Sequence, residues 1–140
     1  MYTNVFLARC EELKLAGFNP GFEPGRCVAR GFSDLGFEVF QLVRGDKLVS
    51  LFTGKLSEKP HDFEKHFFAV LSCDDMAGWL DRYGYDIGGL RYVEQRRWEL
   101  SLRCSEDQVE VKIEGGTLDE VFLEALHYAF QSPRQARCTQ

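Results

Sequence analysis

The clearest pattern of hydrophobic and polar positions lies between residues 96 and 130. Apolar and polar side chains alternate from Trp98 to Cys104 and again from Val109 to Ile113. A period of two is typical of antiparallel strands with one dry and one wet face. We therefore predict a hairpin that turns at residues 105–108, with opposite charges pairing across its wet face.

A helix is predicted directly after this hairpin. Thr117 and Glu120 have the spacing of a capping box, and Pro133 ends the pattern. The apolar side chains recur at the three- and four-residue spacing of a helix face, so we expect this helix to cover the dry face of the hairpin. These residues are Leu118, Val121, Phe122, Ala125, Leu126, Ala129 and Phe130.

Two further helices are predicted nearer the N-terminus. Thr3 caps the first, which ends at Gly17. Ser72 opens the second, with an acidic residue at Asp75 completing a capping box, and Gly84 ends it. Each helix has an apolar stripe and thus a face to bury.

The pattern between residues 27 and 53 favours strands. Segments 36–43 and 47–53 flank a Gly45-Asp46 turn, a combination that suits a tight hairpin. These two strands carry apolar side chains on both faces, so either both faces are covered or the strands pack against a partner chain. The latter alternative makes a homodimer one explanation of the pattern.

Three other segments complete the expected order of elements. Residues 54–66 form a polar connection, residues 67–71 (FFAVL) a short buried strand, and residues 86–95 a strand that contains two glycines. The prediction is an α+β fold with mostly antiparallel sheet and three helices, in the order α-β-β-β-α-β-β-β-α. It forms one domain over residues 1–132 or two small lobes, 1–60 and 61–132, followed by a polar tail at 133–140.

Composition narrows the classes of partner. The 140 residues are 44% hydrophobic and carry a net charge of −5, with a pI of about 5.2. This acidity argues against general nucleic-acid binding and against anionic membranes, which both attract Lys and Arg. We expect a cytoplasmic protein, because there is no long apolar run or secretion signal and the five scattered cysteines suit free thiols.

The search for catalytic and metal-binding patterns favours a protein that is not an enzyme. His61 and His66 miss the spacing of a zinc-binding helix, and no phosphate-binding glycine loop is present, so no metal or cofactor is expected. Cys27 lies near two arginines, and Cys73 lies in the first turn of a helix. Nearby positive charge at Cys27 and the helix dipole at Cys73 could each favour a thiolate, although Asp74 and Asp75 oppose one at Cys73 by like charge. Inert thiols are the preferred interpretation for all five cysteines, and a thiol enzyme is a third, less favoured hypothesis.

Two groups of residues are candidates for binding. Arg97 and Arg103 share the wet face of the C-terminal hairpin, although Glu99 between them makes a balanced, solvated face the simpler interpretation. The other group lies in a turn-rich arm, where aromatic rings could stack a base and guanidinium groups could hold a phosphate, unless the arm is an ordinary packed loop. Its members are Phe18, Phe22, Arg26, Arg30 and Phe32.

A resemblance to a known family adds a functional hypothesis. Between Phe67 and Phe130 the segments FFAV, DDMAGWLDRYG, WELSL, GGTLDEV and ALHYAF resemble the small phage proteins described as the phage ABA-sandwich domain. That family carries no assigned active site, so no residue role is transferred. The resemblance implies a phage or mobile-element accessory protein acting in the bacterial cytoplasm.

Two functions follow as hypotheses. The first is a non-enzymatic inhibitor, for example of the anti-CRISPR type, whose acidic surface binds a basic surface of a host defence complex. The alternative is a sponge protein that sequesters a small nucleotide, an immune second messenger, in the aromatic arm.

Overall fold

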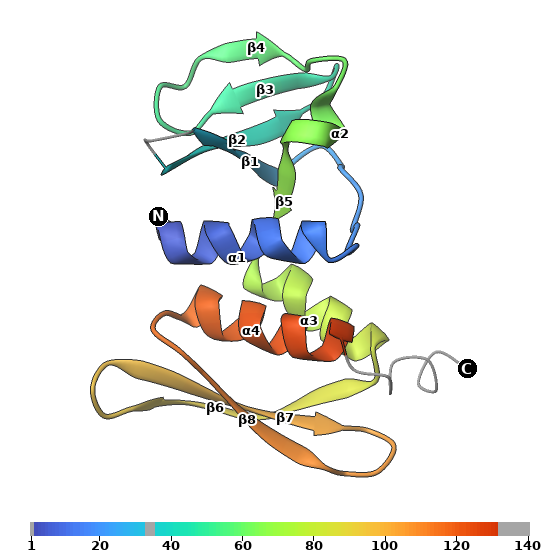
Figure 1. Ribbon diagram of the computed structural model, residues 1–140, viewed down its shortest axis with the longest axis vertical. Coiled ribbons are helices and arrows are strands. Elements are labelled where there is room, and N and C mark those ends of the chain that lie inside the picture. The colour runs from blue at the N-terminus through green and yellow to red at the C-terminus, as the bar shows by residue number, and fades with distance from the viewer. Residues whose placement is uncertain (1, 33–35, 132–140) are drawn as a thin grey trace. The chain divides into compact units, whose positions relative to one another are not determined.

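The computed structural model describes residues 2–32 and 36–131 (Figure 1). The chain forms two compact units, Met1–Leu71 and Ser72–Gln140. The described residues contain four helices and two antiparallel sheets, of five and three strands. The predicted α+β class with mostly antiparallel sheet is therefore confirmed.

The first unit contains two helices and a sheet with the strand order β4-β3-β2-β1-β5, in which every neighbouring pair is antiparallel. Its elements are α1 (Asn4–Leu15), β1 (Cys27–Phe32), β2 (Gly36–Val43), β3 (Lys47–Ser50), β4 (Leu56–Glu58), α2 (Phe63–His66) and β5 (Phe68–Val70).

Local signals explain α1 and the turn between β2 and β3. The hydroxyl of Thr3 accepts a hydrogen bond from the backbone N–H of Phe6, and Gly17 follows the helix with φ +107°. In the turn, Gly45 and Asp46 have φ of +83° and +57°, which these residue types adopt readily. The predicted helix start and hairpin are therefore confirmed.

The predicted strand over residues 47–53 is too long, because β3 ends at Ser50. The hydroxyl of Ser50 accepts hydrogen bonds from the backbone N–H groups of Phe52 and Thr53. These local bonds compete with the sheet ladder and turn the chain.

The predicted polar connection at residues 54–66 is wrong in part, because it contains both β4 and α2. All three residues of β4 are exposed, and the strand exists because it pairs with β3 in the register Lys47↔Glu58. The predicted order also lacked β1, so the observed order is α-β-β-β-β-α-β-α-β-β-β-α.

Both faces of the central strand β2 are covered within the first unit. On one face, α1 packs on β2 and β5 and buries residues that include Phe6 and Leu13. On the other face, Phe63 and Phe67 pack with Phe40 and other core residues of the sheet. Elements of the same chain therefore account for the two-sided apolar character of β2.

The second unit has the predicted hairpin at its centre. Its elements are α3 (Cys73–Arg82), β6 (Tyr85–Val93), β7 (Arg97–Cys104), β8 (Glu110–Gly115) and α4 (Leu118–Gln131), and its sheet has the order β6-β7-β8. Leu100, Leu102 and Cys104 are fully buried on the dry face, where α4 packs on β7 and β8. In Figure 1, α4 runs along one face of this sheet.

The caps of the two helices in this unit are also confirmed. Ser72 and Asp75 form a reciprocal capping box at the start of α3. The hydroxyl of Thr117 accepts a hydrogen bond from the backbone N–H of Glu120 at 3.1 Å, which starts α4.

The boundary between the two units falls between Leu71 and Ser72, after β5, whereas the sequence placed the boundary of its alternative lobes between residues 60 and 61. Segment 61–71 belongs to the first unit because β5 pairs with β1. The predicted tail at 133–140 and the stop at Pro133 lie outside the described residues.

Candidate functional site

Two aromatic side chains of the predicted binding arm are buried fully or in part. Phe18 is buried, and the partly buried Phe22 packs edge-on against Phe63 with 4.8 Å between the ring centroids. The ring of Phe18 is therefore closed to a stacking base, and that of Phe22 is open only in part. The side chain of Phe32 lies outside the described part of the chain, and its backbone pairs with Gly36 at the end of β1.

The first arginine of the arm has a structural role. The guanidinium of Arg26 donates hydrogen bonds to the carbonyl oxygens of Pro20 and Gly21, at 3.2 and 2.7 Å. These bonds tie the side chain of Arg26 to the backbone of its own arm. They give a donor to two carbonyl oxygens that lie outside any helix or strand.

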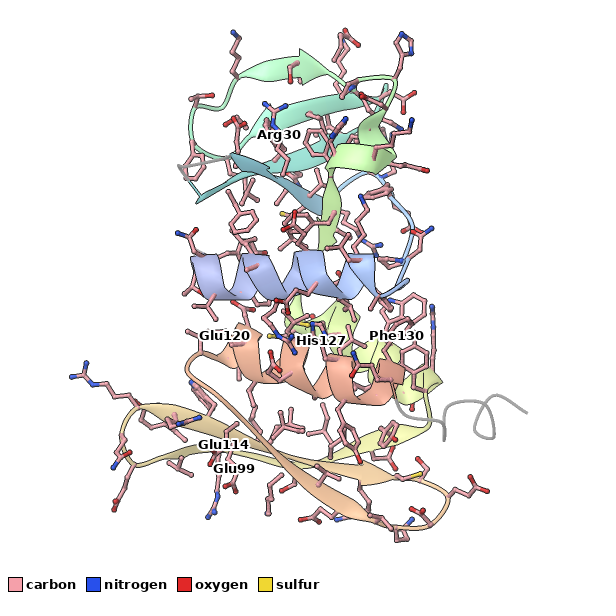
Figure 2. All side chains as sticks on the ribbon, in the orientation of Figure 1. Arg30, Glu99, Glu114, Glu120, His127 and Phe130 are labelled. Atoms are coloured by element: carbon pink, nitrogen blue, oxygen red, sulfur yellow. The ribbon has the colours of Figure 1, made fainter. Side chains whose placement is uncertain are left out.

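Arg30 lies on β1, apart from the hydrogen-bonded arm (Figure 2). Its guanidinium donates through Nη2 to Oε1 of Glu38 at 3.1 Å. The same group lies 5.4 and 5.5 Å from the ring centroids of Phe40 and Phe67. The ion pair and the two cation–π contacts hold the guanidinium in one place.

A polar depression of about 480 Å³ lies beside Arg30. It is lined by Glu11 from α1, by Arg30 and Gly31 from β1, and by Lys65 and His66 from α2. Of these lining residues, only Arg30 was identified from the sequence as a candidate for binding. The residues come from three separate elements, and no regular spacing in the sequence connects them.

His66 makes a further contact at the edge of the depression. Its Nε2 lies 2.8 Å from Oδ2 of Asp62, and this hydrogen bond lowers the pKa of the Asp62 carboxyl. Lys65 and His66 therefore place an ammonium group and an imidazole ring on the side of the depression formed by α2.

The other two predicted binding residues lie on the wet face of the three-stranded sheet. Arg97 Nη2 is 3.4 Å from Oε2 of Glu114, and Arg103 Nη2 is 3.7 Å from Oε2 of Glu110. Both pairs join β7 to β8, as the alternation of charges predicted. A role for these two arginines in binding a partner stays a prediction.

Glu99 links all three strands of this face. Its Oε1 accepts a hydrogen bond from Nε of Arg91 on β6 at 3.0 Å and lies 3.8 Å from Nζ of Lys112 on β8. Figure 2 shows Glu99 and Glu114 on this sheet. The middle of the face is therefore a balanced ladder of ion pairs.

The two ends of the same sheet differ in charge. Exposed Arg91, Arg96 and Arg97 gather at the end formed by the β6–β7 turn. At the opposite end, the start of β6 and the β7–β8 turn expose Asp86, Glu106 and Asp107, which we call the acidic end.

The two cysteines that were candidates for a thiolate, Cys27 and Cys73, both have raised pKa values. Burial and the nearby Asp119 carboxylate raise the pKa of Cys73 to about 12, and its Sγ lies 3.4 Å from Oδ1 of Asp119. Burial also raises the pKa of Cys27, despite a hydrogen bond from the side chain of Tyr2. The expected activation by the helix N-terminus at Cys73 is outweighed by these two effects.

Within residues 2–32 and 36–131, no group of three or more His, Cys, Asp or Glu side chains is arranged to hold a metal ion. None of the helices in these ranges has the length and apolar character required to cross a membrane.

No family model matches this chain, and comparisons with curated proteins and with solved structures find no match.

Proposed function

We propose that this protein is a non-enzymatic binding protein of phage type that inhibits a bacterial defence component by docking on a basic surface of it. The observation that carries the proposal is the acidic end of the three-stranded sheet. The net charge of −5 and the resemblance of residues 67–130 to small phage proteins also support it.

The acidic end is held in a defined shape. Oδ1 of Asp107 accepts a hydrogen bond from the backbone N–H of Val109, and Nε2 of Gln108 donates to the carbonyl of Ser105, both at 3.0 Å. The hydroxyl of Ser105 donates to Oδ2 of Asp86 at 3.1 Å, which joins the turn to β6. Charges on an ordered turn lose little freedom on binding, and this favours affinity.

An apolar side chain lies within the acidic end. Val109 is 45% exposed, next to the carboxylates of Glu106 and Asp107. A partner that approaches under electrostatic attraction can therefore bury an apolar contact there as well.

The two alternative functions receive less support from the geometry. A nucleotide sponge that stacks bases on the arm requires open ring faces, whereas Phe18 is buried and Phe22 is partly buried against Phe63. A thiol enzyme requires an accessible thiolate, whereas the pKa of Cys73 is about 12.

The experiment is a pull-down from bacterial lysate that contains candidate defence complexes, read by mass spectrometry, followed by binding measurements with the purified target. We expect affinity to fall as salt rises from about 0.05 to 0.5 M, because exposed charges are screened. Affinity that does not change with salt would contradict the proposal.

A matched pair of variants locates the contact. Glu106→Lys in the β7–β8 turn should weaken binding by roughly tenfold, mainly through slower association. Glu94→Lys in the β6–β7 turn makes the same charge change at the opposite end of the same sheet and should have little effect. Equal effects of the two variants would rule out the acidic end as the docking surface.

A further inference from the structure

We propose that the depression between α1, β1 and α2 is a binding site for the phosphate group of a small molecule. This site lies wholly within residues 11–66 of the first unit and does not depend on the acidic end of the second unit. It therefore adds a ligand to the protein-binding function proposed above.

The depression exists because β1 extends further than its neighbour β5. The last pair between these strands is Ala29↔Phe68, and Gly31 continues beyond it. The carbonyl of Arg26 accepts a hydrogen bond from Leu42 on β2. Because successive residues of a strand point their polar groups to opposite sides, the backbone of Gly31 is directed to the side of β5 and α2.

Arg30 supplies the fixed cation of the site. Its side chain is 42% exposed, while Glu38, Phe40 and Phe67 hold the guanidinium from the protein side. A guanidinium binds phosphate oxygens through paired N–H groups, and one that is already ordered loses little freedom on binding.

Lys65 supplies an ammonium donor from the last turn of α2, and His66 lies beside it. Both side chains are exposed and line the depression. The helix that carries them is anchored, since Phe63 stacks on Phe67 at 4.7 Å between centroids and Lys14 donates to the carbonyls of Glu64 and Phe67. Three nitrogen-bearing side chains and Gly31 thus line one hollow.

The carboxylates around the site reduce its net positive charge, and one of them offers a test. Glu11 lines the depression, Glu38 binds Arg30, and Asp62 binds His66. Glu38 is paired with Arg30 and Asp62 is hydrogen-bonded to His66, whereas Glu11 lines the hollow and opposes an anion by like charge. Removing the charge of Glu11 should therefore strengthen phosphate binding.

The test uses the full-length protein with two probes, inorganic phosphate and adenosine 5′-monophosphate, at matched ionic strength. Amide chemical shifts in ¹⁵N-labelled protein give the location, and titration calorimetry gives the affinity. We expect saturable shifts at Gly31, Lys65 and His66 with both probes, with the nucleotide competing against phosphate. Binding of the nucleotide alone at these residues also supports the site and identifies a phosphate ester as its ligand.

Four variants make the result decisive. Arg30→Gln should weaken binding by at least about tenfold, and Lys65→Gln should weaken it by several-fold without the risk to folding that Arg30 carries. Glu11→Gln should strengthen binding by about threefold. Lys55→Gln, in the exposed turn before β4, is the matched control and should change nothing.

The proposal is overturned if neither probe gives saturable shifts at these residues, if Lys65→Gln leaves the affinity unchanged, or if Glu11→Gln weakens it. The Glu106→Lys variant should retain full phosphate binding. A failure of the phosphate site and a failure of the acidic end can therefore be told apart.

Discussion

At the residue scale, Lys14 shows how one side chain determines a distant element. Its Nζ donates to the carbonyl oxygens of Glu64 and Phe67, at 2.5 and 2.7 Å, which lie 50 and 53 residues further along the chain. A four-residue helix such as α2 is not stable by itself, and its last carbonyl groups need donors. The ammonium group of Lys14, on α1, donates to two carbonyl groups at the end of α2.

We expect Lys14→Met to lower the free energy of unfolding by about 1–3 kcal/mol, because the variant leaves two carbonyl groups without their charged donor. Urea unfolding followed by circular dichroism measures the change. Lys55→Met removes the charge of a lysine in an exposed turn and should have an effect within about 0.5 kcal/mol. Equal stabilities for the two variants would show that Lys14 does not support α2.

Cys73 shows that neighbours outside the helix decide the state of its thiol. The pKa of about 12 lies above the ordinary value of 9.0 because of burial and because Asp119 opposes a second negative charge. Folding therefore favours the neutral thiol. This contribution to stability is present below about pH 9 and is lost as the pH rises toward 12.

We expect Cys73 to react very slowly with iodoacetamide at about pH 8, where roughly one such thiol in ten thousand is ionised. Asp119→Asn removes the carboxylate charge and should speed the reaction of Cys73 several-fold. Asp81→Asn, near the other end of α3, is the control and should leave the rate unchanged. Peptide mapping by mass spectrometry separates Cys73 from the other cysteines, and fast labelling in the unmodified protein would contradict the raised pKa.

At the element scale, Gly115 sets how closely α4 approaches β8. A Cβ atom at this position would lie 2.6 Å from the backbone nitrogen of Val121 and 2.8 Å from its Cα. Both atoms belong to the helix backbone, so the conflict is relieved only if the strand and the helix move apart. At the adjacent Gly116, a Cβ would meet only the Glu120 carboxylate at 3.6 Å.

Gly115→Ala is therefore expected to destabilise the protein by about 1–3 kcal/mol through overpacking. Gly116→Ala is the matched control and should change stability by less than about 0.5 kcal/mol. Thermal unfolding of both variants measures the difference. If both substitutions are tolerated equally, the close approach of α4 to β8 is not as described.

The turns of two hairpins show where sequence patterns predict elements well and where they do not. The turn between β2 and β3 contains Gly45, and it was predicted. The turn between β6 and β7 gives Gln95 and Arg96 φ of +68° and +59°, without a glycine to mark it. The sequence therefore extended the strand to residue 95, although β6 ends at Val93.

At the scale of the whole molecule, the apolar character of both faces of segments 36–43 and 47–53 left a homodimer open. The structure covers one face of β2 with α1 and the other with Phe63 and Phe67, all from the first unit. The pattern of β2 is thus satisfied within one chain, whereas Leu51 and Phe52, just after β3, are 49% and 60% exposed.

We accordingly expect light scattering coupled to gel filtration to give the mass of one chain, 16.1 kDa, over a wide range of protein concentration. A mass near twice this value, or one that rises with concentration, would show that another surface joins two copies. The Glu106→Lys and Glu94→Lys variants then test whether either end of the three-stranded sheet forms that surface.

The sequence by itself determined the elements whose signals are local. Periodicity identified the hairpin of β7 and β8 and the dry face that α4 covers, and capping residues marked the starts of α1, α3 and α4. These signals depend on residues a few positions apart, which a sequence displays directly.

Only the tertiary structure decided β4, α2 and the candidate sites. The strand β4 exists through its pairing with β3, and the depression beside Arg30 needs Glu11, Arg30 and Lys65 from three elements. Burial and Asp119, 46 residues away, override the local dipole at Cys73. In each case the deciding interactions join groups that are far apart in the chain. No local sequence pattern shows that these groups are close in space.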